Sequence, residues 1–337
     1  YLMGFIFLYM MVLVLIYFPT LWAMFLSYVA QVIILVPVIY NTHKRMQETI
    51  TDKQIACFES SMLVSKIFMA VVLGFMFVYF ALIVTACLIA DYNHNTIAFS
   101  LIGAVAVFCS TLLNLWAFFF IILDAQSSQL EIKELIKLSK EQTLSMYEYD
   151  TVHNQLRFVN ANSSNIADGV ALVAYLSMVG FILVLFMYGE TEKLSELSGS
   201  TNFYGSEQGR IILTFCSALL QSREAVLILL ALPHIAEVNE LHDQLSSTLA
   251  HKEWGESTIT PSTTYDSYSV VSSDVISVHK NNLCMRMWAA TVDRPLYMYV
   301  LGRPIKRVEM KAQLVTVCLV AMGSLLSFLF SNVYDTI

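Results

Sequence analysis

Long apolar segments alternate with short polar segments along almost the whole chain. Seven of the apolar stretches reach roughly 17 to 25 residues or more, the length that a helix needs to cross a bilayer. They are Leu2–Phe18, Leu21–Tyr40, Leu63–Ala90, Phe99–Leu123, Val170–Tyr188, Ile211–Pro233 and Leu314–Tyr334. Only Pro19 and Thr20 separate the first two, so the count becomes six if these form one span. The pattern predicts an all-α membrane protein with seven transmembrane helices.

The composition agrees with a membrane location. Hydrophobic residues make up 57% of the 337 positions and charged residues 13%, and the mean hydropathy is +0.64. A soluble fold of this size could not bury so much apolar surface. The net charge of -7 comes from acidic residues spread through the polar segments, which gives no reason to expect a nucleic-acid partner.

Lys and Arg are distributed unevenly among the connections between the predicted spans. Fifteen of the 19 lie in the second, fourth and sixth connections, whereas the odd-numbered connections contain only Lys193 and Arg210. Connections rich in basic residues resist translocation and stay in the cytoplasm. The sequence therefore predicts a cytoplasmic N-terminus and an extracellular C-terminus, the reverse of a G-protein-coupled receptor.

This orientation divides the chain into five parts. We expect spans 1 to 4 in residues 1–123, a cytoplasmic helical connection in 124–169, spans 5 and 6 in 170–234, a second cytoplasmic connection in 235–311 and the last span in 312–337.

Helical periodicity continues from the spans into the cytoplasmic connections. Ile132, Leu135 and Ile136 share one helical face, so we expect the fourth span to run on below the membrane. Residues 251–280 are rich in Ser and Thr and are expected to be disordered. The mixed apolar and basic stretch 282–312 is expected to form a helix against the cytoplasmic face.

The chain has no catalytic pattern. Its seven histidines are isolated, and the motifs of zinc proteases, serine hydrolases and phosphate-binding loops do not occur. Its six cysteines are scattered without a C-x-x-C spacing. We therefore expect no enzyme, no cofactor and no metal site.

Three segments near the cytoplasmic face resemble the insect gustatory and odorant receptor superfamily, which also has nematode members. They are Asp150-Thr-Val-His-Asn-Gln-Leu-Arg-Phe-Val-Asn, His234-Ile-Ala-Glu-Val-Asn-Glu-Leu-His and Tyr299-Val-Leu-Gly-Arg-Pro-Ile-Lys-Arg. The likeness extends roughly from Leu130 to the C-terminus, and the inverted topology agrees with it. The last span of that family usually carries a Thr-Tyr pair and a later Gln-Phe pair, of which only Thr316 is present here. The resemblance is thus to a divergent, gustatory receptor-like member.

The resemblance implies a chemosensory, ligand-gated cation channel subunit of the plasma membrane. A small molecule would bind in the outer half of the earlier spans and open a central pore lined by the seventh span, which depolarises the cell. The implied assembly is a homotetramer, or a heterotetramer with related subunits, in contact with membrane lipid.

Candidate site residues lie in three spans. A pore wall needs small or polar groups along one stripe of a helix, and the last span offers Gln313, Thr316, Val320, Gly323, Ser324 and Ser327. Small residues at this spacing also permit close packing between helices, which is the alternative interpretation. Candidates for a ligand pocket or for gating are Asn114, Trp116, Gln221, Arg223 and Glu224.

Arg223 and Glu224 fall near the middle of the sixth span. A charge at that depth costs about 2.5 to 3.5 kcal/mol on insertion scales, so both should face protein or a water-filled cavity. They serve either function or a structural ion pair between helices. For Asn114 the alternative is a hydrogen bond that joins two helices.

Two other functions fit a multi-span chain. A seven-span receptor that couples to G proteins requires the opposite orientation of the connections. A small-solute transporter usually shows internal repeats or paired spans broken by Gly and Pro, and the sequence contains no such repeat.

Overall fold

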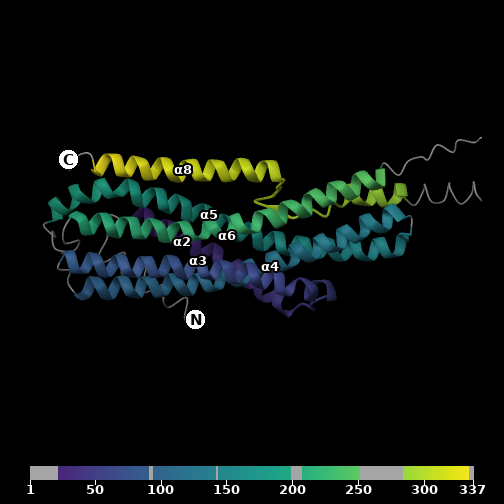
Figure 1. The fold of residues 1–337 in the computed structure, drawn as a ribbon, viewed down its shortest axis with the longest axis horizontal. Coiled ribbons are helices and arrows are strands. Elements are labelled where there is room, and N and C mark those ends of the chain that lie inside the picture. Colours follow the sequence, from purple (N-terminus) through teal and green to yellow (C-terminus); the bar gives the residue numbers. More distant parts are fainter. Residues whose placement is uncertain (1–21, 91–93, 142, 199–206, 251–283, 334–337) are drawn as a thin grey trace, which may run out of the picture.

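The computed structural model describes residues 22–90, 94–141, 143–198, 207–250 and 284–333, where the chain is almost entirely helical. The long helices are α2 (Trp22–Gln47), α3 (Asp52–Ala90), α4 (His94–Glu141), α5 (Met146–Ser198), α6 (Glu207–Ala250) and α8 (Arg307–Val333). Figure 1 shows that these helices run side by side along the long axis of the molecule. The prediction of a mainly helical protein is therefore confirmed.

Two helices in the described part are long and apolar enough to cross a membrane, judged by length and composition. These segments are Asp52–Val78 within α3 and Arg307–Ser327 within α8. The other predicted spans from Leu21–Tyr40 to Ile211–Pro233 lie largely within α2, α4, α5 and α6. The first, Leu2–Phe18, falls outside the described residues. The count of seven spans stays a prediction.

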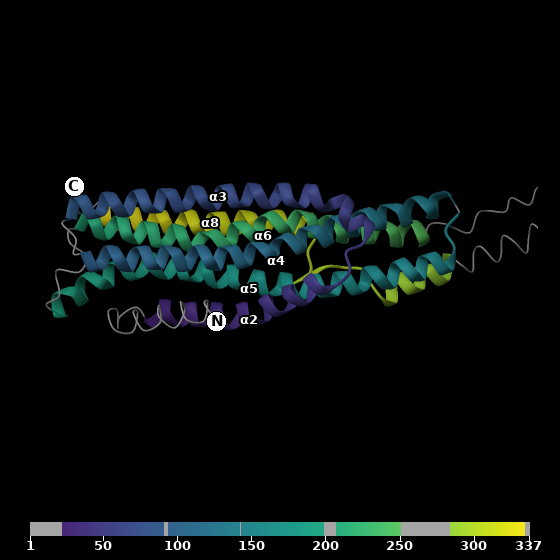
Figure 2. The ribbon, with the colours of Figure 1, turned by 90° about the horizontal axis from the view of Figure 1, so that it is seen from below.

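The fourth, fifth and sixth predicted spans belong to helices that continue without interruption into the neighbouring connections, as expected. In Figures 1 and 2 the ends of α4, α5 and α6 extend beyond α2 and α3. The expected apolar face on α4 is present, because Ile132, Leu135 and Ile136 are all buried. These extensions form one hydrophobic core with the bundle.

α4 is the central helix of the bundle. Every residue from Ala117 to Ala125 is buried, whichever way it points around the helix. A helix that is buried on all sides must have neighbours on all sides, and α4 contacts α2, α3, α5 and α6.

Side chains fix where α3 and α5 begin. Ahead of α3, the hydroxyl of Thr51 accepts from the backbone N–H of Gln54, and the Gln54 side chain accepts from the N–H of Thr51. Ser145 and Glu148 form the same reciprocal pair before α5. Both are capping boxes, which satisfy backbone donors that a helix start leaves unpaired.

The expectation of one helix over residues 282–312 is wrong. Residues 284–293 are helical, and an antiparallel pair of short strands follows, β1 (Tyr299–Val300) and β2 (Arg303–Pro304). Pro295 disfavours the helical conformation in the residue before it. Leu301 and Gly302 both have positive φ, as a tight two-residue hairpin turn requires. The predicted disordered segment, 251–280, lies outside the described residues.

Candidate functional site

Helix α8 is little covered by the part of the chain that the structure describes. It lies alongside α5 and α6 at the edge of the bundle (Figure 1), yet none of its most apolar 18-residue window is buried. A long apolar helix with no cover in a single chain needs lipid or another protein against it. α8 is also the helix in which the sequence places the pore-lining candidates.

The described pore-lining candidates all remain accessible on α8. Thr316 and Ser324 satisfy their hydroxyls within the helix, by donating to the carbonyl oxygens of Ala312 (2.9 Å) and Val320 (2.8 Å). Gly323 has no neighbouring atom within 4 Å of the position that a Cβ would occupy. Ser327 is exposed, and the side chain of Gln313 lies outside the described residues.

A second stripe on α8 consists of large apolar side chains spaced three or four residues apart. Each is about half exposed or more: Val315, Leu319, Met322, Leu326 and Phe330. Because residues at this spacing share one face of a helix, α8 carries a small and polar stripe next to an apolar stripe. Neither stripe is covered by the described part of the same chain.

The start of α8 is attached to α6 by charged side chains. Lys306 forms an ion pair with Asp243 at 2.7 Å, and Arg307 forms one with Glu240 at 3.1 Å. Hydrogen bonds with Lys306 and Tyr297, and the charge of Lys306, keep the pKa of the Asp243 carboxyl below its usual value although burial opposes this. These pairs are partly exposed and individually weak, but together they fix the direction in which α8 leaves the bundle.

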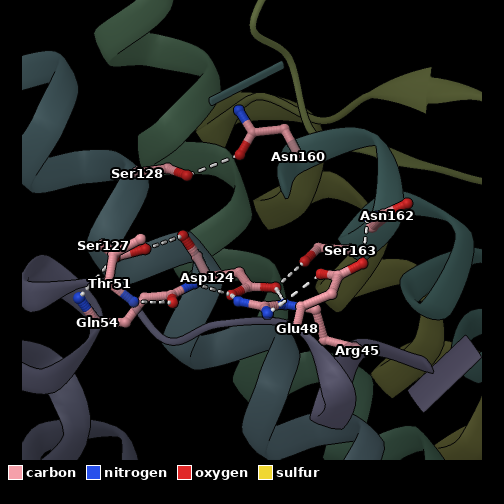
Figure 3. A network of polar contacts seen from close by, with 10 residues as sticks. All are labelled: Arg45, Glu48, Thr51, Gln54, Asp124, Ser127, Ser128, Asn160, Asn162 and Ser163. Atoms are coloured by element: carbon pink, nitrogen blue, oxygen red, sulfur yellow. Dashed lines mark hydrogen bonds and ion pairs between the residues drawn. The ribbon is translucent and has the colours of Figure 1, made fainter. Parts of the chain in front are cut away.

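A buried polar network joins α2, α3, α4 and α5 where the predicted spans meet the connections predicted to be cytoplasmic (Figure 3). The carboxylate of Asp124 is fully buried. The Arg45 guanidinium donates to both of its oxygens, from Nε at 2.9 Å and from Nη2 at 2.7 Å. Gln54 donates to the same carboxylate at 2.7 Å, and the Ser163 hydroxyl donates to its other oxygen.

Glu48 and Asn162 extend this network toward the surface. Arg45 Nη1 contacts Glu48 at 3.2 Å, and the Asn162 amide donates to the other oxygen of Glu48 at 3.2 Å. Burial by itself would lower the pKa of Arg45, but the hydrogen bonds and charge of Asp124 outweigh it and raise that pKa. The network therefore links side chains of four helices, α2, α3, α4 and α5.

The sequence analysis did not identify this network. Its one signal was the position of Asp124, directly after a 25-residue apolar segment, with Arg45 shortly after another. The pairing itself could not be read from the sequence, because the two residues lie 79 positions apart.

Two of the predicted ligand-pocket residues, Asn114 and Trp116, differ in burial. Asn114 is buried and its amide nitrogen has no hydrogen-bond partner. Trp116 is 52% exposed, and its ring meets that of Phe119 edge-on. α6 includes Gln221, Arg223 and Glu224, but their side chains lie outside the described residues.

A cavity of about 360 Å³ lies at the far end of α6, against the helix 284–293. Its walls include His242, Asp243, Trp288 and Tyr297. Burial lowers the pKa of His242 to about 4, so this imidazole is neutral at physiological pH. The cavity is not in the outer half of the spans, where the resemblance places a ligand.

Within the part of the chain that the structure describes, no three His, Cys, Asp or Glu side chains come together as a metal site would require. In comparisons with known proteins, no family model and no curated sequence matches this chain.

Proposed function

We propose that this chain is a subunit of an oligomeric, ligand-gated cation channel of the plasma membrane with a chemosensory role. The subunit detects a small molecule and admits cations through a pore bordered by α8 of each copy. It is related, in this proposal, to gustatory receptors as a divergent member.

The observation that carries the proposal is the uncovered helix α8. Its 27 residues present a small and polar stripe beside an apolar stripe. In an oligomer around a central axis, the first stripe faces water in the pore and the second packs against lipid or a neighbouring subunit. A single chain alone gives neither stripe an environment that suits it.

The three segments that carry the family resemblance meet in one region below the predicted spans, which supports the same proposal. Asn160 donates to the carbonyl of Leu296 at 2.6 Å, just before the third segment. Glu240 of the second segment pairs with Arg307 of the third. Residues 67 to 136 positions apart thus form one unit at the start of α8.

The experiment is thallium uptake by cells that express the full chain, during exposure to a panel of sugars and alkaloids such as sucrose and quinine. We expect at least one compound to raise uptake above that of mock-transfected cells. Absence of uptake across the panel, together with a second-messenger response to the same compounds, would instead establish a receptor coupled to G proteins.

Pore lining is tested by cysteine substitution in a Cys318→Ala background, because Cys318 is an exposed thiol of α8. Ser324→Cys and Ser327→Cys should allow a charged, membrane-impermeant thiol reagent to block thallium uptake. Leu319→Cys, on the apolar stripe, is the matched control and should stay insensitive. Equal block at all three positions would contradict the assignment of the stripes.

A further inference from the structure

The segment between the helix 284–293 and α8, which we call the connector (residues 294–306), is held in place by side chains of α5 and α6. Its own regular structure is limited to two strands of two residues each. Most of its anchoring contacts are hydrogen bonds from its backbone to buried or partly buried side chains of the bundle. The connector therefore takes its position from those two helices.

Asn239 of α6 holds both arms of the hairpin at once. Its amide nitrogen donates to the carbonyl oxygens of Met298 (3.0 Å) and Ile305 (2.9 Å), and its amide oxygen accepts from the N–H of Met298 (2.8 Å). The side chain is fully buried. An unbonded amide in such a place is costly, whereas here donor and acceptor both find backbone partners.

α5 holds the same hairpin from one face of its helix. Asn160 donates to the carbonyl of Leu296, the Tyr299 N–H donates to Ser164 at 2.8 Å, and the Leu301 N–H donates to Asp168 at 2.5 Å. Residues 160, 164 and 168 are four positions apart and lie along one stripe. The connector is thus fixed to α5 and α6 together.

From these contacts we infer that Asn239 is a positioning residue that couples α6 to α8. Because α8 is so little covered, its placement depends on its start, and the connector and the Arg307–Glu240 pair determine that start. A displacement of α6 therefore carries the hairpin and the first turn of α8 with it. The role in gating rests on the proposed channel function, whereas the coupling itself does not.

Asn239→Asp is the sharpest variant, because it keeps the shape of the side chain and removes the donor. A carboxylate oxygen then faces the carbonyl oxygens of Met298 and Ile305 and repels them. Ser164→Ala is a milder variant on α5 that removes the acceptor of the Tyr299 N–H. Thr248→Ala is the matched control on α6, since that hydroxyl donates only within its own helix.

The first measurement is hydrogen exchange, followed by mass spectrometry, on the purified full chain in detergent. In Asn239→Asp we expect the amides of residues 296–306 to exchange about tenfold faster, as loss of well-placed hydrogen bonds predicts. Residues 228–238 should keep their wild-type rates. Ser164→Ala should give a smaller change in the same peptide. Unchanged exchange in the connector, or equal acceleration throughout α6, would overturn the coupling.

The second measurement is thallium uptake evoked by the most effective compound of the sugar and alkaloid panel, at matched surface expression. Asn239→Asp should lower the evoked uptake several-fold, while Thr248→Ala should leave it unchanged. Wild-type uptake in Asn239→Asp would overturn the role in gating. If the wild-type chain itself takes up no thallium, the proposed channel function fails, and the exchange rates alone decide whether the connector is coupled.

Discussion

Each oxygen of the buried Asp124 carboxylate accepts from two donors. Arg45 supplies two, and Gln54 and Ser163 supply one each. A protein with a buried ion pair is often no more stable than one in which apolar residues replace both partners. Removal of one partner alone, however, leaves an uncompensated charge in the core. The network therefore specifies how α2, α3, α4 and α5 meet more than it adds to their stability.

Arg45→Ala should accordingly destabilise the protein by about 3 to 5 kcal/mol, because Asp124 is left charged and buried. The measurement is thermal unfolding of the detergent-purified full chain. Lys137→Ala is the control, since the Lys137–Glu141 pair is exposed on both sides and is worth at most about 1 kcal/mol. Similar unfolding temperatures for the two variants would show that the network does not hold the helices together.

His242 makes the stability of the protein depend on pH. Its Nδ1 accepts from the Leu296 N–H at 3.4 Å, and burial lowers its pKa from 6.5 to about 4. The neighbouring charges are Asp243, which favours protonation, and His153 and Lys306, which oppose it. Between pH 6.5 and about pH 4, His242 is protonated in the unfolded chain but stays neutral in the folded chain. The stability of the folded state therefore falls as the pH drops through this range.

The full loss attributable to His242 is about 3 kcal/mol. We expect the unfolding temperature to decrease between pH 7.5 and pH 5, and to decrease less in His242→Asn, in which the amide oxygen replaces Nδ1 as the acceptor. A wild-type decrease that His242→Asn retains in full would assign the effect to other groups, of which the buried His153 is the nearest.

At the scale of elements, Gly169 determines how closely α2 and α5 cross. A Cβ built at this position would overlap the Cγ2 methyl of Val38, a branched side chain with little freedom to move away. Gly169→Ala should therefore destabilise the protein by about 1 to 3 kcal/mol through overpacking, in spite of the better helix propensity of Ala. Thermal unfolding in detergent measures this effect.

Gly74→Ala is the matched control, because Gly74 also lies inside a helix but has no neighbouring atom within 4 Å of the added Cβ. It should be neutral or stabilising by up to about 1 kcal/mol. If both variants unfold alike, the contact between α2 and α5 is looser than the structure indicates.

The described helices and their continuation below the predicted spans could be read from the sequence, because apolar periodicity persists through residues such as Ile132 and Ile136. The hairpin of the connector could not be predicted, because a mixture of basic and apolar residues also fits a surface helix. Pro295 and Gly302 were the signals in the sequence that favour a turn instead. The hydrogen-bond partners of Asn239 and Asp124 could not be predicted from the sequence, for a physical reason. Each contact depends on which helices become neighbours, whereas the apolar periodicity shows only which face of a helix is buried.

At the scale of the whole molecule, the predicted orientation rests on the distribution of Lys and Arg. The polar network is compatible with a cytoplasmic location for residues 124–169. The sequon Asn162-Ser163-Ser164 lies within α5, where Asn162 bonds to Glu48 and Ser163 to Asp124. A glycan on Asn162 would be incompatible with these contacts.

We therefore expect an epitope tag placed after Ile337 to be accessible to antibody on intact cells, and a tag before Tyr1 to require permeabilisation. Asn162 should carry no glycan, as shown by unchanged mobility after glycosidase treatment. Tyr204→Thr creates a sequon at Asn202 in the fifth connection, predicted to be extracellular, and this site should be glycosylated as a positive control. A glycan on Asn162, with none on Asn202, would reverse the orientation. It would place α8 with its C-terminus in the cytoplasm and leave a receptor coupled to G proteins as the better account of the same helices.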